Sequence, residues 1–154
     1  MIKIIFVGKT KDSSILSMQE HYLKMIKPFC KLKILHIPKS KLSQKRGINE
    51  ILEDEGKRVV ENFSKDDFII SLDRKGSQKT TKELAAQIKA TFNQSRHPAF
   101  VVGSGFGLAN DVLRQSDLVL SFSQLTFTHN LIRPFLFEQL YRVLTIIYNK
   151  KYHY

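Results

Sequence analysis

The 154-residue sequence has no tryptophan, four prolines and one cysteine, and these shortages already exclude some protein classes. A single thiol, Cys30, cannot form an internal disulfide, so the disulfide framework of small secreted proteins is excluded. No run of about 18 apolar residues occurs, so we expect no membrane-spanning segment and no membrane partner. Residues 1–8 form too short and too interrupted an apolar stretch for a signal peptide. We therefore expect a cytoplasmic protein.

Disorder is also excluded, because 42% of the residues are hydrophobic and no low-complexity tract interrupts the chain. A chain of this length buries about 70% of the surface that its unfolded form exposes. It can therefore support a core of its own, and we expect one domain over residues 1–154.

Acidic residues are scarce: 14 aspartates and glutamates face 25 lysines and arginines, which gives a net charge of +11. Most of the excess positive charge lies before Asn49, where the acidic residues are Asp12 and Glu20 alone. The cations counted there are Lys9, Lys11, Lys24, Lys27, Lys31, Lys33, Lys39, Lys41, Lys45 and Arg46. A basic half on a compact domain favours a polyanionic partner, RNA or DNA before an acidic membrane surface. The alternative is a solvated, lysine-rich surface that serves solubility.

Short β-branched runs alternate with amphipathic stretches along the whole chain. Strands are predicted at 2–7, 33–37, 67–73, 99–102 and 118–122, and helices at 14–28, 51–63 and 80–92, with a short one through 112 and a last one from about 133. Thr80 and Glu83 have the spacing of a helix-starting capping box. The segment 39–49 has no apolar pattern and is expected to be a loop. The alternation predicts an α/β fold with a mainly parallel sheet flanked by helices. One side of the last helix is expected to carry Phe135, Leu136, Leu140, Val143, Leu144 and Ile147.

Two glycine motifs imitate nucleotide sites. Gly8-Lys9-Thr10 is not a phosphate-binding P-loop, because Lys3 stands where that loop needs its first glycine. The glycines at 103, 105 and 107 are not a dinucleotide fingerprint, because Leu108 replaces its third glycine. They allow a ligand to approach the backbone closely, or they serve only a tight turn. The histidines have no metal-site spacing and are interpreted as structural.

The last thirty residues are the most specific part of the sequence. Residues 121–133 read SFSQLTFTHNLIR, residues 138–142 read EQLYR, and Tyr152-His153 nearly closes the chain. With the glycine segment, the Val7-Gly8-Lys9 opening and the strand end at residues 71–73, this block resembles the ribosomal large subunit methyltransferase H family, a branch of the SPOUT methyltransferases. The resemblance covers nearly the whole chain. Two positions depart from the family pattern, Ser104 in place of a glycine and Lys151 in place of a proline.

The resemblance implies a sheet whose C-terminal part is threaded into a trefoil knot, and a homodimer. It implies binding of S-adenosyl-L-methionine in that knot, and methylation of N3 of a pseudouridine in 23S rRNA of the large ribosomal subunit. Carried over to this sequence, the cofactor site is Leu72, Gly103, Phe122, Ser123, Gln124, Leu125, Thr126 and Phe127. The same carry-over makes His153 a candidate base, with Tyr152 and Arg142 positioning the RNA. The alternative for His153 is a terminal histidine without a role.

This chemistry needs neither a metal nor a covalent nucleophile. The sulfonium of S-adenosylmethionine is already activated, so a protein must mainly align the attacking nitrogen with the methyl group. The N3 imide must also lose its proton, which requires a base or a path to solvent. Two other hypotheses remain open, a non-catalytic RNA-binding module with the same fold and a small nucleotide binder that uses the glycine turn alone.

Overall fold

The computed structural model describes residues 1–41 and 47–151, and its centre is a sheet of five parallel strands. The strands are β1 (Ile2–Val7), β2 (Leu32–Ile37), β3 (Asp67–Gln78), β4 (His97–Val102) and β5 (Leu118–Ser121). Their order across the sheet is β2-β1-β4-β3-β5, and every pairing is parallel. The predicted α/β fold with a parallel sheet is confirmed.

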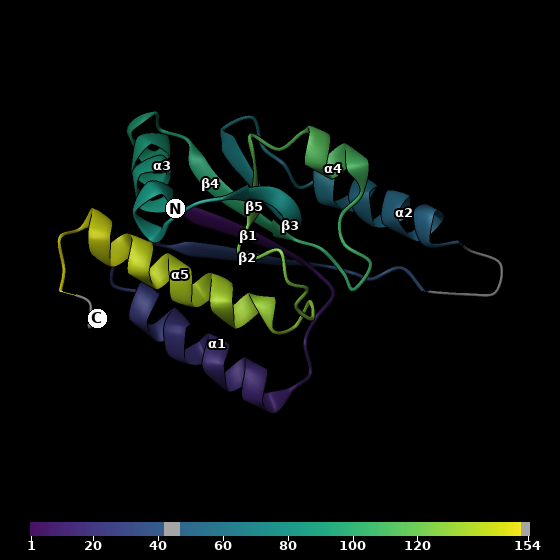
Figure 1. Ribbon diagram of the computed structural model, residues 1–154, viewed down its shortest axis with the longest axis horizontal. Coiled ribbons are helices and arrows are strands. Elements are labelled where there is room, and N and C mark those ends of the chain that lie inside the picture. Colours follow the sequence, from purple (N-terminus) through teal and green to yellow (C-terminus); the bar gives the residue numbers. More distant parts are fainter. Residues whose placement is uncertain (42–46, 152–154) are drawn as a thin grey trace.

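Helices cover both faces of this sheet (Figure 1). α1 (Ser13–Ile26), α3 (Thr81–Asn93) and α5 (Ile132–Ile147) lie together on one face, while α2 (Ile48–Val60) and α4 (Asn110–Arg114) pack on the other. Alternate residues of a strand point to opposite faces. In β1, Ile4 and Phe6 therefore enter the core under α1, α3 and α5, while Ile5 and Val7 enter the core under α2 and α4. Burial on both faces explains why these strands are continuous apolar runs.

Two elements have bounds that differ from the expectation by three residues or more. α2 begins at Ile48 and ends at Val60, three residues earlier at each end than predicted, because its helical pattern already starts after Gly47. β3 continues to Gln78 instead of ending at Asp73. Its register shifts between Leu72 and Ser77, so that both residues pair with Leu120. The extra residues bend the strand outward beside β5.

Apolar spacing in the sequence puts Met18 on the buried face of α1 and Phe135 on that of α5, and the structure shows both positions to be wrong. Met18 is 44% exposed, whereas the neighbouring Gln19 is buried. Phe135 is 40% exposed, whereas Phe137 is fully buried. The buried stripe of α5 follows the 3.6-residue period through 133, 136, 137, 140, 143 and 144, and Phe135 is one residue out of phase with it.

The predicted start of α3 is confirmed. The Glu83 amide donates to the Thr80 hydroxyl at 3.2 Å, and the Thr80 amide donates to the Glu83 carboxylate at 2.7 Å. The Thr80 hydroxyl also donates to this carboxylate, at 2.8 Å. The bonds from the Thr80 amide and hydroxyl favour the ionised carboxylate and hold the pKa of Glu83 below its ordinary value. Within residues 1–41 and 47–151, no helix has the length and apolar character to cross a bilayer.

Candidate active site

A cavity of about 820 Å³ opens at the carboxyl ends of β4 and β5, beside the point in β3 where its register shifts. Leu72 of β3, Val102 of β4 and Leu120 of β5 form its floor. In open parallel sheets, ligands bind in the crevice outside the carboxyl ends of the strands. The volume falls in the range of about 300–1,000 Å³ that small-molecule sites occupy. This crevice is therefore the first place to look for a ligand.

The turn after β4, residues 103–107, forms one wall of the cavity. Gly107 has a φ of +94°, which favours glycine, and Ser104 pairs with Gly107 in an antiparallel bridge. A Cβ on Gly103 would overlap the Gly107 carbonyl and approach Leu108 Cγ to 3.1 Å. The glycines thus serve a tight turn, and the same turn presents its backbone to the cavity.

The segment between β5 and α5 forms the opposite wall. Short hydroxyl bonds shape it: the Ser121 hydroxyl donates to the Ser123 carbonyl at 2.9 Å, and the Ser123 hydroxyl accepts from the Leu125 amide at 3.0 Å. At its end, the Thr128 hydroxyl accepts from the Leu131 amide at 3.2 Å. Such turns leave much of the backbone free to meet a ligand.

Seven of the eight predicted cofactor residues line this one cavity, although they come from three separate parts of the chain. They are Leu72, Gly103, Phe122, Ser123, Leu125, Thr126 and Phe127. Gln124 is exposed and is not among the lining residues. The structure brings the set together, and its role in binding stays a prediction.

His129 lines the same cavity, and the sequence analysis missed it. Lys39, 90 positions away, lies with its ammonium nitrogen 2.7 Å from His129 Nε2. Burial, and then the positive charges of Lys39 and Arg133, lower the pKa of His129. No local pattern announces this contact, because the residues meet only when β2 and the start of α5 fold against the same strand end.

Arg133 is fully buried at the start of α5. Its guanidinium donates to the carbonyls of Val7 at 2.9 Å, Gly8 at 3.0 Å and His129 at 3.1 Å. Its central carbon also lies 4.6 Å from the centre of the Phe6 ring. Burial lowers the pKa of Arg133 to about 10, so it is still a cation at neutral pH. Arg133 therefore ties α5 to the end of β1 beside the cavity.

Of the three predicted catalytic residues, the structure describes only Arg142, which does not line this cavity. Arg142 forms an ion pair with Glu138 on α5, about 15 Å along the helix axis from Ile132 at the cavity edge. Tyr152 and His153 lie outside the described residues. In the part of the chain that is described, no cluster of three histidine, cysteine or acidic side chains is arranged to hold a metal ion.

Comparison with known proteins assigns the chain to a family. A family model described as a predicted SPOUT methyltransferase matches residues 1–153. The chain belongs to the SPOUT methyltransferase family. It is 38% identical over 153 residues to the ribosomal RNA large subunit methyltransferase H of Caldicellulosiruptor bescii, with 99% of both chains covered. It is 36% identical to the protein of that name from Malacoplasma penetrans, covering 99% of this chain and 98% of the relative.

A solved structure described as a probable methylase family protein from Haemophilus influenzae Rd KW20 has the same fold. The match has a TM-score of 0.62 at 17% identity and covers 99% of this chain and 70% of the other. At this identity the likeness shows the fold alone.

SPOUT methyltransferases use S-adenosylmethionine, and the cavity fits such a group. Its glycine turn can bring backbone amides and carbonyls against a ligand without side chains in the way. Phe122 and Leu72 supply apolar surface for a flat base. Asn130 also lines the cavity, and its buried side-chain oxygen has no hydrogen-bond partner within the described residues. A polar ligand would satisfy it.

Proposed function

We propose that the chain methylates ribosomal RNA of the large subunit with S-adenosylmethionine, and that the acceptor is N3 of a pseudouridine in 23S rRNA. The observation that supports this most is the cavity beside β3 at the ends of β4 and β5, lined by seven of the eight residues that the family resemblance assigns to the cofactor. Full-length relatives at 36–38% identity carry the name ribosomal RNA large subunit methyltransferase H.

The protein's own contribution is to bind and to align. Bound S-adenosylmethionine supplies a methyl group on an activated sulfonium. Leu72, Gly103 and the segment 122–127 hold the adenosine part between the two walls of the cavity. Alignment of this kind can lower a barrier by about 7–11 kcal/mol at best, so no metal or covalent nucleophile is required.

The active form in this proposal is a homodimer in which one protomer's tail serves the other's cavity. The Lys150 amide donates to the Thr145 carbonyl at 2.9 Å, which holds the start of the tail beside the last turns of α5. Thr145 lies about 20 Å along the helix axis from Ile132 at the cavity edge. Lys150 thus lies near the end of α5 that is remote from the protomer's own cavity, which supports a tail that serves the cavity of the second protomer.

Exposed aromatic side chains offer the dimer a surface. Phe127 and Phe135, each 40% exposed, pack edge to face with ring centres 5.6 Å apart. They border a second cavity of about 300 Å³ between the starts of α3 and α5. Light scattering at micromolar concentration should give the mass of two chains. A fully active monomer would contradict the dimer.

A trefoil knot is also part of the proposal. It is supported by the way the 103–107 turn and the segment before α5 enclose the same cavity, with Gly105 beside the His129 ring. Joining the two chain ends covalently gives the test. When denatured, a knotted ring is more compact than an unknotted ring of equal length and elutes later in size exclusion.

The basic first half of the chain is proposed to grip rRNA phosphates, through Lys9, Lys11 and the segment 39–46. Lys9 and Lys39 are exposed, and each lies two residues after a strand, β1 and β2 respectively. Lys45 and Arg46 lie outside the described residues.

The deciding experiment combines calorimetry with a methylation assay. S-adenosylmethionine should bind, and a labelled methyl group should enter 23S rRNA at one nucleotide. Intact large subunits and free rRNA are offered in separate reactions, which shows which of the two the protein methylates. Mass spectrometry of the nucleoside locates the methyl group. Binding of RNA without binding of S-adenosylmethionine would instead indicate the non-catalytic RNA-binding module.

A further inference from the structure

We propose that His129 is a hydrogen-bond donor of the active site, with its Nδ1–H directed at an anionic oxygen of the bound ligand, and that Lys39 is the residue that positions it. The inference rests on the proposed function, since it assigns roles within the same cavity. It gives specific roles to a histidine that the sequence analysis interpreted as structural and to a lysine that it only counted among the cations of the basic half.

The contact between the two side chains determines which ring nitrogen carries the proton. A lysine ammonium can only donate, so at 2.7 Å from Lys39 Nζ the Nε2 atom of His129 must accept. A neutral imidazole has one N–H, and its proton must then be on Nδ1. A Cβ built on Gly105 would lie 3.5 Å from this Nδ1 atom. Both residues line the cavity, so the Nδ1 side of the ring lies against the 103–107 turn that forms one of its walls.

The turn at Gly8 lets Lys39 reach His129. Gly8 has a φ of +81°, and a Cβ there would lie 2.8 Å from Cγ and 2.9 Å from Cδ of Lys39. The lysine stem therefore crosses the bare face of Gly8, and a side chain at that position would push it away. The Gly8 carbonyl in turn accepts from Arg133 at 3.0 Å and lies 3.3 Å from His36 Nδ1.

The charges around His129 favour a neutral ring and an anionic ligand. Lys39 approaches it from the segment after β2 and Arg133 from the first turn of α5, and both cations lower its pKa. His36 of β2 faces the Gly8 carbonyl between them. Two acids line the cavity. Asp12, before α1, has one carboxylate oxygen that accepts from the Ser14 and Ile15 amides, and Asp73 of β3 accepts from the Lys75 amide at 2.8 Å. Arg74 of β3 is a further cation in the lining. A negative oxygen placed near Nδ1 would gain both a hydrogen bond and the field of two cations.

The proposed reaction offers two oxygens of this kind. One is the carboxylate of the amino-acid end of S-adenosylmethionine. The other is a carbonyl oxygen next to N3 of the target base, which becomes anionic once N3 has lost its proton to a base or to solvent. In that case the N–CH₃ bond forms as the S–CH₃ bond breaks, the electron pair of the broken bond remains on sulfur, and a donor at the neighbouring oxygen stabilises the anion beforehand.

The first test needs no ligand and no catalysis. In ¹⁵N NMR of the free protein, His129 should show the Nδ1–H tautomer and should titrate below the ordinary histidine range. Lys39→Met should raise that titration and remove the tautomer preference, and Gly8→Ala should do the same by displacing the lysine stem. Lys33→Met, which removes an exposed lysine of β2, is the matched control and should leave the His129 signals unchanged. An Nε2–H tautomer in the wild type, or a Lys39→Met variant with wild-type signals, would overturn the proposal.

The second test asks which oxygen is bound. His129→Leu removes the donor, and His129→Asn keeps an N–H near the position of Nδ1. If the oxygen is the carboxylate, His129→Leu should bind S-adenosylmethionine about tenfold more weakly, with unchanged affinity for 5′-methylthioadenosine, which lacks that group. If it belongs to the base, both affinities should stay unchanged while kcat falls about 10²-fold. His129→Asn should restore part of either loss.

Unchanged affinities and unchanged kcat in His129→Leu would overturn the role of the donor. Failure of the wild type to bind S-adenosylmethionine would instead contradict the proposed function, and the tautomer of His129 in the free protein is measured independently of it.

Discussion

Replacement of Arg133 by methionine is the sharpest test of how α5 is attached beside the active site. The guanidinium donates to three carbonyls, those of Val7, Gly8 and His129, and lies over the Phe6 ring. Methionine fills a similar volume but donates nothing. The variant therefore breaks the connection between the end of β1 and the start of α5 while it keeps the core filled.

Two opposing effects decide the magnitude. Each hydrogen bond from a charged donor contributes about 1.5–3 kcal/mol, and the contact with Phe6 about 1–2 kcal/mol. Removal of a buried cation recovers its desolvation cost, which is about several kcal/mol. The carbonyls that remain in a dry site outweigh this gain, since each unsatisfied one costs about 1–3 kcal/mol. We expect a net loss of about 3 kcal/mol, which lowers Tm by about 6–12 °C for a chain of this size.

Thermal and urea unfolding measured side by side provide the assay. Arg114→Met is the matched control, because the Arg114 side chain is 73% exposed and its ion pair with Asp111 lies on the surface. The control should change stability by less than about 1 kcal/mol. An Arg133→Met variant as stable as the wild type would refute the reasoning, because it would mean that desolvation of the cation outweighs all of its hydrogen bonds.

Three further outcomes are expected. Gly103→Val should reduce S-adenosylmethionine affinity at least tenfold in calorimetry. The valine side chain would overlap the Gly107 carbonyl, and the overpacking, which costs about 1–3 kcal/mol, would open the turn. Wild-type affinity in this variant would exclude the turn from the site. Thr80→Ala should lower Tm by about 2–4 °C at pH 7. The pKa of Glu83 is lowered in the folded protein. The stability that the carboxylate contributes is therefore present above its ordinary pKa and is lost as the pH falls through the lowered pKa. The difference in Tm between Thr80→Ala and the wild type should shrink in acid, and a constant difference would contradict the capping box. Alanine at Lys41, Lys45 and Arg46 should flatten the salt dependence of rRNA binding by about 0.7–0.9 in log K per log salt for each phosphate that is no longer bound; an identical slope would mean that the segment meets only water.

Local sequence determined most of the secondary structure. β-branched runs such as Ile2–Val7 became the buried strands of the sheet, because alternate residues of a strand reach opposite faces and both faces are covered. The Thr80 cap could also be predicted from local sequence, because its partners lie within one helical turn. Where a pattern was one residue out of phase, as at Phe135, the packing of α5 against the sheet decided which side was buried.

The cavity itself came from the order of strands in the sheet. Leu72, Gly103 and Phe122 are distant in sequence and meet because β3, β4 and β5 are neighbours in the sheet. A motif resemblance could name these residues, but only tertiary structure shows that they enclose one space and that Gln124 lies outside it.

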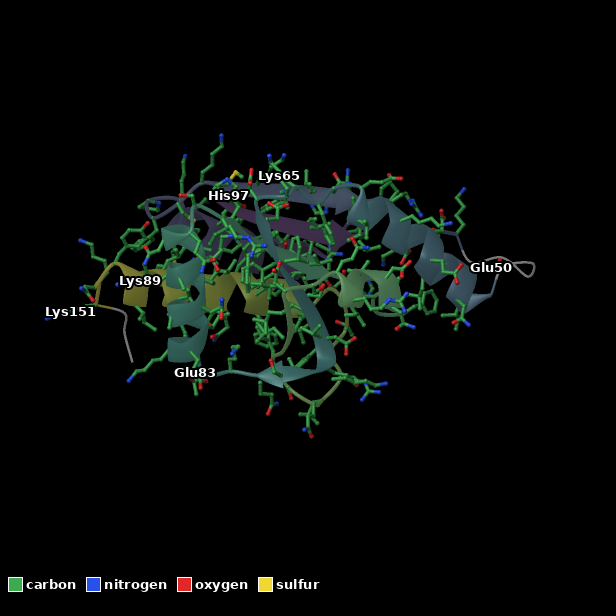
Figure 2. The ribbon with its side chains drawn as sticks, turned by 90° about the horizontal axis from the view of Figure 1, so that it is seen from above. Glu50, Lys65, Glu83, Lys89, His97 and Lys151 are labelled. Carbon is green, nitrogen blue, oxygen red and sulfur yellow. The ribbon has the colours of Figure 1, made fainter. Side chains whose placement is uncertain are left out.

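The contacts of Lys39, His129 and Arg133 beside the cavity could not be predicted from local sequence. The order β2-β1-β4-β3-β5 puts β1 between β2 and β4, so that Lys39 and His129, 90 positions apart, meet over the bare face of Gly8. A histidine's tautomer and an arginine's burial depend on which groups surround them, and those groups come from every part of the chain. Figure 2 places Lys151 and Glu50 at opposite ends of the molecule, with Lys151 just after α5 and Glu50 near the start of α2. The helices, the strands and the family motifs could thus be predicted from the sequence. The distances between residues of different elements were decided only by the tertiary structure, because they depend on the order of strands in the sheet.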